Sequence, residues 1–324
     1  MDKIHFPYRS TSHLLLLHVI SESGSWAKYN LEVEYNKKIA SGDSHNAVTS
    51  GDVEFVSGNH LSPYGRRARG DDWVFLGQTV NTCAGRQMVV RPDSGIEKIE
   101  DLRGKVVGSH GRHPKLNDWL QLKQHGLDAD RDEVGLINQL GKGSEEGGVE
   151  EKAGPLWTWV RDKKVDAAFM NVPGCVFAER AGLKTIEVEA LPMIYYTTIS
   201  SSEKFVQSHP ELVDRFLKGL IEGIHFFKTQ PVKSMQIIKE RFTNDGQMDD
   251  DIARVSYETY AHTLEPKLFP TMNAIQNVYL EGVRQDKDAA KINPLELWDL
   301  HYIRKISDSG FVDDLYNTTG GTHG

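Results

Sequence analysis

Several histidines and arginines of this chain follow strand-like segments, the positions where side chains of α/β proteins usually meet ligands. His60 comes shortly after the strand-like segment 53–56, and Arg9 follows the first strand-like segment, 3–8. Imidazole titrates near neutral pH, so His60 could act as a general acid or base, or donate to an anion. Arg9 could clamp a carboxylate or sulfonate through two hydrogen bonds. A loop histidine bonded to backbone and a surface arginine are the alternatives.

A second group of candidates follows the strand-like segment 105–108. His110 and His113 could form a metal pair, but the chain contains no His-Glu-x-x-His or Cys-x-x-Cys motif, and Pro114 interrupts the helical spacing. Binding of an anion together with Arg112 is the favoured interpretation. The sequence therefore predicts neither a metal nor a cofactor.

Two further features have simpler explanations than catalysis. Cys83 could be a nucleophile, but a lone cysteine is more often a small buried apolar residue. Arg66, Arg67 and Arg69 lie beside two aspartates, and mixed charges of this kind predict an exposed, solvated loop.

The elements that must position these residues alternate along the first two thirds of the chain. Short apolar strand-like segments are separated by helix-like ones, which predicts an α/β fold. From about residue 208 the pattern is helical, with Ser208 and Glu211 as a predicted capping box. An apolar stripe at helical spacing follows, formed by Leu212, Val213, Phe216, Leu217, Leu220, Ile221 and Ile224.

Composition limits the classes of partner. The chain has 324 residues, 38 Lys plus Arg against 46 Asp plus Glu, and a net charge of −8. Its length suggests about two domains, and its charge argues against nucleic acid or an anionic membrane surface as a partner. No apolar run reaches the roughly 18 residues of a membrane span, so no membrane insertion is expected. The start of the chain lacks the pattern of a secretory leader, which predicts a cytoplasmic protein if the sequence is complete and a periplasmic one if a leader was removed.

Several segments together resemble a known family. The chain is similar to type II periplasmic solute-binding proteins of the NMT1/THI5-like branch, which includes proteins for nitrate, sulfonates and thiamine precursors. The resemblance extends from residue 1 to about 240 and rests on Ser21-Glu22-Ser23-Gly24 with Leu31–Glu34, Ala47–Phe55 (AVTSGDVEF), Ile99–Gly108 (IEDLRGKVVG), Lys164–Ala168 (KVDAA) and Ser208–Leu220.

This resemblance implies an α/β fold with two lobes, a central ligand cleft and two hinge crossings. Lobe 1 would comprise residues 1–90 and 198–324, and lobe 2 residues 91–197, so no linker between consecutive domains is expected. Polar side chains after the strands of both lobes would then face the cleft. The ligand-binding residues expected on this basis are Arg9, Ser10, His13, His45, Asn59, His60, Thr82, Ser109, His110, Arg112, His113, Asn171 and Tyr195.

The function implied is capture of a small organic anion, a carboxylate or sulfonate that could be aromatic, for an ABC-type permease if the protein is exported. The alternative is a leaderless cytosolic enzyme on the same scaffold, decarboxylase-like or hydrolase-like, with His60 as acid or base. The family also resembles a cytosolic aromatic desulfinase. That enzyme has a nucleophilic cysteine just after strand 1, where this chain has Arg9 and Ser10, so desulfinase chemistry is not expected.

Overall fold

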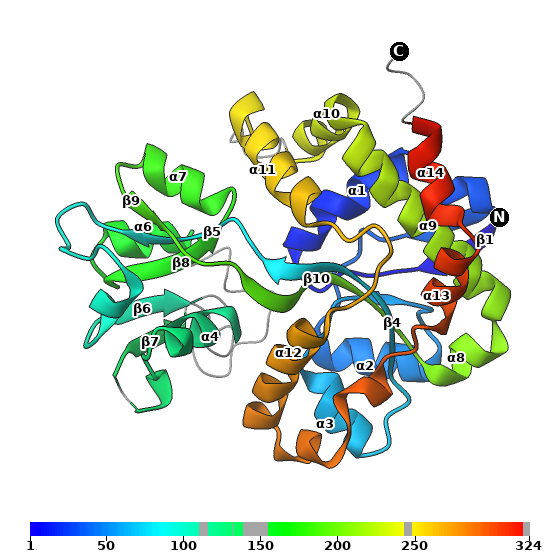
Figure 1. Ribbon diagram of the computed structural model, residues 1–324, viewed down its shortest axis with the longest axis horizontal. Coiled ribbons are helices and arrows are strands. Elements are labelled where there is room, and N and C mark those ends of the chain that lie inside the picture. Colours follow the sequence, from blue (N-terminus) through cyan, green and yellow to red (C-terminus); the bar gives the residue numbers. More distant parts are fainter. Residues whose placement is uncertain (110–115, 132, 139–154, 243–247, 320–324) are drawn as a thin grey trace. The chain divides into compact units, whose positions relative to one another are not determined.

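The chain folds into two compact units. The computed structural model describes residues 1–109, 116–131, 133–138, 155–242 and 248–319. Unit 1 combines Met1–Thr82 with Pro192–Gly324, and unit 2 is Cys83–Leu191 (Figure 1). The chain leaves unit 1 within β4 (Val74–Cys83) and returns within β10 (Leu191–Ser201). The domain ranges expected from the sequence, 1–90 with 198–324 and 91–197, stay a prediction.

Unit 1 contains a two-stranded sheet and a three-stranded sheet. β1 (Asp2–His5) pairs in parallel with β2 (Leu31–Glu34), and β10 lies between β3 (Val56–Ser57) and β4. The two sheets are connected through Tyr8, which forms parallel bridges to Lys38 and to Ser57. The segment after β1 therefore runs beside the end of β3.

Helices make up most of the rest of unit 1. The α-helices are α1 (Leu14–Glu22), α2 (Ser41–Ser50), α3 (Ser62–Ala68), α8 (Glu203–Ser208), α9 (Pro210–Thr229), α10 (Pro231–Arg241), α11 (Asp250–Thr263), α12 (Met272–Gln285), α13 (His301–Asp308) and α14 (Phe311–Thr319). Short 3₁₀ turns are η1 (Thr11–His13), η2 (Ala27–Tyr29), η6 (Lys287–Lys291) and η7 (Pro294–Leu297). No helix in the described part of the chain is both long and apolar enough to cross a membrane.

The apolar stripe predicted from the sequence forms the centre of unit 1. It lies on α9, and all its members except the half-buried Leu212 are fully buried there, which confirms the prediction. Phe216 stacks on Phe55 at a ring-centroid distance of 4.1 Å and on Trp26 at 5.8 Å. Burial of such aromatic side chains contributes about 1.5–3 kcal/mol each. The stripe thus ties α9 to the elements that carry the N-terminal loops.

The capping box predicted at Ser208 is wrong. Ser208 is the last residue of α8, and its hydroxyl donates back to the carbonyl oxygens of Lys204 and Phe205. The next helix, α9, instead begins with Pro210 in its first turn and has no side-chain cap. A Ser-x-x-Glu pattern fits both the end of one helix and the start of the next, so the pattern alone did not distinguish them.

Unit 2 is built around one mixed sheet. Its strands, in the order β7-β6-β8-β5-β9, are β7 (Gly135–Asn138), β6 (Val106–Ser109), β8 (Ala167–Asn171), β5 (Arg86–Val90) and β9 (Lys184–Glu187). β6 pairs in parallel with β7 and β8, whereas β5 is antiparallel to β8 and β9. Helices α4 (Leu116–Gln124), α6 (Leu156–Arg161) and α7 (Gly174–Arg180), with η3 (Ile99–Leu102) and η4 (Ala129–Arg131), complete it. The alternating pattern of the sequence therefore predicted the α/β class correctly.

The close packing of α9 against the segment after α1 generates a stability prediction. A Cβ atom added at Gly219 would lie 2.5 Å from Trp26 Cδ1 and 3.2 Å from Trp26 Cα. Alanine gains about 1 kcal/mol of helix propensity over glycine, but overpacking costs about 1–3 kcal/mol. We expect Gly219→Ala to lower the free energy of unfolding, measured by urea denaturation.

Gly42 provides the matched control. It also lies in a helix, α2, but an added Cβ there has no neighbour within 4 Å. Gly42→Ala should leave the free energy of unfolding unchanged or raise it by up to about 1 kcal/mol, because the gain in helix propensity is not opposed by a close contact. Equal stability of the two variants would contradict the packing described for α9.

Candidate functional site

A loop with unusual backbone geometry follows β3 in unit 1. Gly58 and Asn59 both have positive φ, 105° and 72°, a region that glycine enters freely and asparagine tolerates. A Cβ atom at Gly58 would lie 2.7 Å from His13 Cε1 and 3.2 Å from Arg9 Cβ. The glycine therefore allows the loop to pack directly against both side chains, and the turn delivers His60 to the same place.

Arg9 reaches this place from the segment after β1. Its backbone N–H donates to Ser57 O at 3.2 Å, because Tyr8 pairs with the end of β3. One guanidinium nitrogen donates to Ile39 O at 2.7 Å, which fixes the direction of the half-buried side chain. Arginine keeps its positive charge at all physiological pH values. This part of unit 1 therefore holds a permanent cation.

Two imidazoles are held beside it by hydroxyl groups. His13 Nδ1 lies 2.7 Å from Ser57 Oγ, and His60 Nδ1 lies 2.8 Å from Thr198 Oγ1. Both hydroxyls belong to neighbouring strands, because Ser57 lies opposite Ile199 in the pairing of β3 with β10. The paired strands therefore set the spacing of the two rings.

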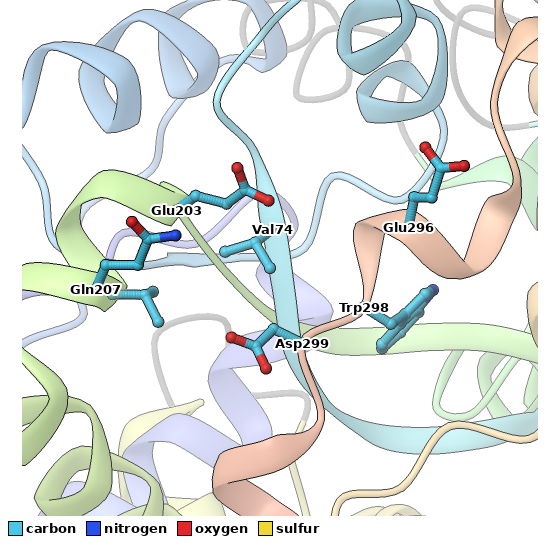
Figure 2. Close-up of a pocket in the computed structure, with 7 residues that line it drawn as sticks. Val74, Glu203, Gln207, Glu296, Trp298 and Asp299 are labelled. Carbon is cyan, nitrogen blue, oxygen red and sulfur yellow. The ribbon is translucent and has the colours of Figure 1, made fainter.

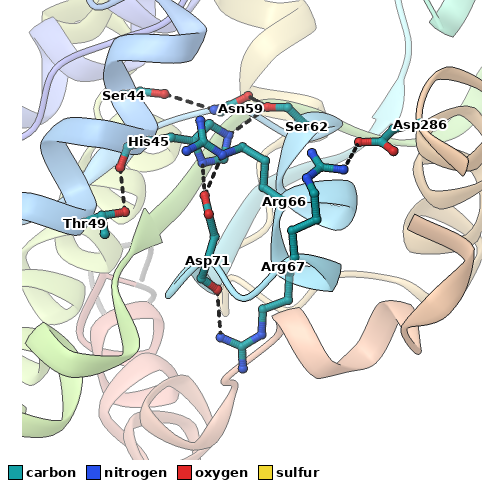
Figure 3. Close-up of polar contacts among 10 residues, drawn as sticks. Ser44, His45, Thr49, Asn59, Ser62, Arg66, Arg67, Asp71 and Asp286 are labelled. Carbon is teal, nitrogen blue, oxygen red and sulfur yellow. Dashed lines mark hydrogen bonds and ion pairs between the residues drawn. The ribbon is translucent and has the colours of Figure 1, made fainter. Parts of the chain in front are cut away.

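A third histidine, His45, is linked to the loop after β3 through the hydroxyl of Ser62. His45 Nε2 is 2.9 Å from Ser62 Oγ, and the Ser62 hydroxyl donates to Asn59 Oδ1 at 2.8 Å (Figure 3). The Asn59 amide in turn donates to Ser44 Oγ at 3.0 Å. His45 is only 1% exposed, and its ring centroid lies 4.4 Å from that of Trp73. This network connects α2, the loop after β3 and the start of α3.

All three histidines are uncharged at neutral pH. Burial lowers the pKa of His13 and of His45 to about 3, and that of His60 to about 4. The positive charge of Arg9 lowers the pKa of each of them further, and Arg66 has the same effect on the pKa of His45. The site thus combines one cation with neutral imidazoles.

Two helix starts lie on the same segments. Ser10 precedes η1 and His13 precedes α1, and neither side chain makes a capping bond. The residue before α2 is Ala40, whose methyl group cannot accept a hydrogen bond. The first N–H groups of a helix carry partial positive charge and can bind an anion when no side chain occupies them. Ser10 and Ser12 are both exposed, and the Ser12 hydroxyl donates to Ser10 Oγ at 3.0 Å. The local field therefore favours a negatively charged group.

The remaining candidates lie elsewhere. The ring of Tyr195, in β10, lies 4.2 Å from that of Tyr196 and packs against the core of unit 1. Thr82 is partly buried at the end of β4. In unit 2, Ser109 and Asn171 end strands β6 and β8, and the Ser109 hydroxyl donates to buried Asp118 at 2.5 Å.

His110, Arg112 and His113 lie outside the described residues. Across the described ranges, no group of three or more His, Cys, Asp or Glu side chains is arranged to hold a metal ion. The structure thus brings together Arg9, His13 and His60, with Asn59 and His45 as their support.

The sequence did not point to the residues that hold the imidazoles. Ser57, Thr197, Thr198 and Gln78 lie in strands, are fully buried, and have no motif around them. Thr198 and His60 are 138 positions apart in the chain. Only the pairing of β10 with its neighbours brings them into contact, so no local pattern could have indicated them.

Two interpretations of other residues are resolved by the structure. The solvated loop predicted for the arginine cluster is wrong: Arg66 and Arg67 lie in α3, and Arg69 follows it. These arginines bond to Asp71 at 2.5 Å, to Glu203 at 2.5 Å and to Asp286 at 2.8 Å. Such pairs hold the helix against neighbouring segments.

The cysteines are buried, with 2% exposure each. Burial raises the pKa of the Cys175 thiol to about 11, so it carries no thiolate at neutral pH.

A separate hollow on unit 1 has the wrong charge for an anion. Figure 2 shows that three carboxylate side chains, from Glu203, Glu296 and Asp299, project around it. The other lining residues are Val74, Val206, Gln207 and Trp298. Because like charges repel, the group around Arg9 is the better candidate for anion binding.

The lowered histidine pKa values predict how stability depends on pH. Histidine in an unfolded chain has a pKa near 6.5, and the folded values are about 3 to 4. Between these limits the unfolded state binds more protons, so stability is full above about pH 6.5 and decreases as the pH falls toward 4. His45→Gln should make the melting temperature fall less steeply over this range. The exposed His262, changed to Gln, is the control, and a slope unchanged in His45→Gln would contradict the assignment.

The structure of this chain is similar to those of sulfonate-binding proteins. The sulfonate-binding protein SsuA from Methylobacillus flagellatus superimposes with a TM-score of 0.70 and 14% identity, covering 96% of each chain. SsuA from Xanthomonas axonopodis, solved with MOPS, gives a TM-score of 0.61 and 12% identity over 93% of this chain and 99% of that one.

An enzyme has a similar structure. A Cys-to-Ser mutant of DszB in complex with biphenyl-2-sulfinic acid gives a TM-score of 0.64 and 15% identity, over 95% of this chain and 100% of that one. These likenesses confirm the type II periplasmic-binding-protein-like fold expected from the sequence. No curated protein sequence matches the chain. The family model described as NMT1/THI5 like matches residues 13–234, and the chain therefore belongs to the NMT1/THI5-like family.

Proposed function

We propose that this chain binds a small organic anion, a sulfonate or a carboxylate, as the substrate-binding component of an ABC-type importer. The observation that carries the proposal is the group of Arg9, His13 and His60 around Gly58. A guanidinium can form two parallel hydrogen bonds with either kind of anion. The neutral imidazoles add hydrogen-bonding atoms without adding charge.

The electrostatics of unit 1 favour this ligand class over a cation or a neutral sugar. Arg9 is the charged group that acts on all three histidines, and the uncapped starts of α1 and α2 add partial positive charge on the same segments. Within the described residues, the side chains of His13 and His60 bond to the hydroxyls of Ser57 and Thr198 and not to a carboxylate. The similar SsuA proteins are described as sulfonate-binding, which agrees with this class.

Delivery to a permease and export to the periplasm belong to the same proposal. They rest on the family and on the similar proteins, which are described as periplasmic and as parts of sulfonate transporters.

The alternative function is an enzyme that uses His60 for proton transfer. A general base works best when its pKa is near the working pH, whereas burial and Arg9 lower the pKa of His60 to about 4. A base this weak is unprotonated at pH 7 but abstracts protons poorly. The pKa therefore favours His60 as a hydrogen-bonding group for a ligand that is released unchanged.

Arg9→Gln tests the proposal. We expect a panel of small sulfonates and carboxylates, screened by thermal shift and then by calorimetry, to contain at least one acid that binds the wild-type protein. Loss of a charge-assisted hydrogen bond costs about 1.5–3 kcal/mol, so Arg9→Gln should weaken that acid about 10-fold to 100-fold. Mass spectrometry of the acid after long incubation should find it unchanged.

Arg304→Gln is the matched control, because the side chain of Arg304 is 77% exposed and forms an ion pair with Asp308 on its own helix. It should bind the acid as the wild type does. The proposed anion site would be contradicted if no acid binds, or if Arg9→Gln binds the acid as tightly as the wild type does. If the wild-type protein converts the acid and His60→Gln does not, the chain is an enzyme that uses His60.

A further inference from the structure

A buried hydrogen-bond chain in unit 1 begins at Gln78. Its side-chain nitrogen donates to Val80 O at 2.6 Å and to Tyr195 O at 2.7 Å. Carbonyl oxygens can only accept, so the amide must present its NH₂ group to them. The Gln78 Oε1 atom therefore points the other way, as an acceptor, and the residue is fully buried, so no solvent competes for it.

This orientation determines the proton of Thr198. The Thr198 hydroxyl lies 2.6 Å from Gln78 Oε1, and it must donate because an amide oxygen cannot. A hydroxyl has one proton, so toward His60 the same oxygen can only accept. His60 Nδ1, at 2.8 Å, must consequently carry the ring proton. Thr198 is also fully buried, which excludes water from the chain.

The other ring nitrogen of His60, Nε2, is therefore unprotonated. Neutral imidazole carries one N–H, so Nε2 has a lone pair and accepts. Burial and Arg9 keep the ring neutral, with a pKa of about 4. Among the described residues nothing donates a hydrogen bond to this nitrogen, and His60 is partly exposed. The Arg9 side chain packs against Gly58, two residues before His60, so the guanidinium and this lone pair belong to the same region of unit 1.

His13 is held in a similar but less strictly directed way. Its Nδ1 bonds to the Ser57 hydroxyl, which donates to Thr197 Oγ1 at 3.2 Å, so in this arrangement Nδ1 carries the ring proton. A hydroxyl acceptor such as Thr197 can exchange donor and acceptor roles, whereas an amide oxygen cannot donate. Only the chain that begins at the Gln78 amide therefore fixes a histidine tautomer without such exchange.

We propose that the ligand of this site is a hydroxy acid, whose anionic group binds at Arg9 while its neutral hydroxyl donates to His60 Nε2. This inference rests on the proposed anion-binding function and narrows its ligand class. An acceptor oxygen of the anion itself would be repelled by the lone pair of Nε2. An ammonium group would be repelled by Arg9, whose charge already acts on His60. A neutral O–H or N–H group satisfies both constraints, and of the two only the hydroxyl can also accept a hydrogen bond from the Arg9 guanidinium.

The tautomer can be measured without a ligand. Two-dimensional ¹⁵N–¹H spectra of the full chain, with His60→Gln used to assign the signals, distinguish the Nδ1–H form from the Nε2–H form. We expect His60 in the Nδ1–H form at pH 7. In Thr198→Val the acceptor is lost and the two forms should mix, whereas Thr198→Ser keeps the hydroxyl and should preserve the wild-type form. An Nε2–H tautomer in the wild type would overturn the inference.

Binding of matched acids tests the ligand class. The probes are the three hydroxybenzoates and 2-hydroxyethanesulfonate, each beside its methoxy analogue, with 2-aminoethanesulfonate as the ammonium probe. We expect at least one hydroxy acid to bind about tenfold or more tightly than its methoxy analogue, by calorimetry. The preference should shrink severalfold in Thr198→Val and persist in Thr198→Ser.

The outcomes separate this inference from the proposed function. Equal binding of hydroxy and methoxy acids, with loss of both in Arg9→Gln, would overturn the hydroxy-acid inference and leave the anion site standing. Tighter binding of 2-aminoethanesulfonate than of 2-hydroxyethanesulfonate would also overturn it. If no probe or other small acid binds, the proposed function fails and the inference falls with it.

Discussion

The pairing of β10 with β3 and β4 is the constraint on which the candidate site depends. β10 returns to unit 1 after the whole of unit 2 and lies between two strands from the first part of the chain. Gly58 N–H donates to Thr198 O at 2.9 Å, and the Ser200 hydroxyl donates to Gly58 O at 3.1 Å. The loop that carries His60 is therefore fixed to β10 by backbone and side chain together. Without this strand the Gly58 backbone and the His60 ring would lose these partners.

The same strand pairing explains how a buried polar group can remain stable. Removing polar atoms from water is costly unless each finds a partner. Gln78, Thr197, Thr198 and Ser57 are all fully buried, and each makes at least one hydrogen bond within this small region. Satisfied networks of this kind hold their members in one arrangement. The consequence is a histidine with a defined proton beside a permanent positive charge.

Charge distribution separates the two parts of unit 1 that could bind a ligand. The hollow around Trp298 is surrounded by carboxylates, whereas the segments after β1 and β3 carry Arg9 and neutral imidazoles. In a chain of net charge −8, a local positive site is what an anionic ligand requires. The two regions are therefore suited to opposite charges, and only the second fits the proposed ligand.

The sequence by itself determined the α/β class, the family, the buried stripe of α9 and the positions of Arg9, Asn59 and His60 after strands, because these follow from local periodicity and short motifs. It did not identify Gln78 or Thr198, and it suggested a solvated loop where Arg66 and Arg67 form a helix with ion pairs. Those features depend on contacts between residues far apart in the chain, such as the 120 positions between Gln78 and Thr198. Tertiary structure alone decided which nitrogen of His60 carries the proton. Gln78 determines the direction of the Thr198 hydroxyl, Thr198 determines the proton of His60, and neither residue is near His60 in sequence.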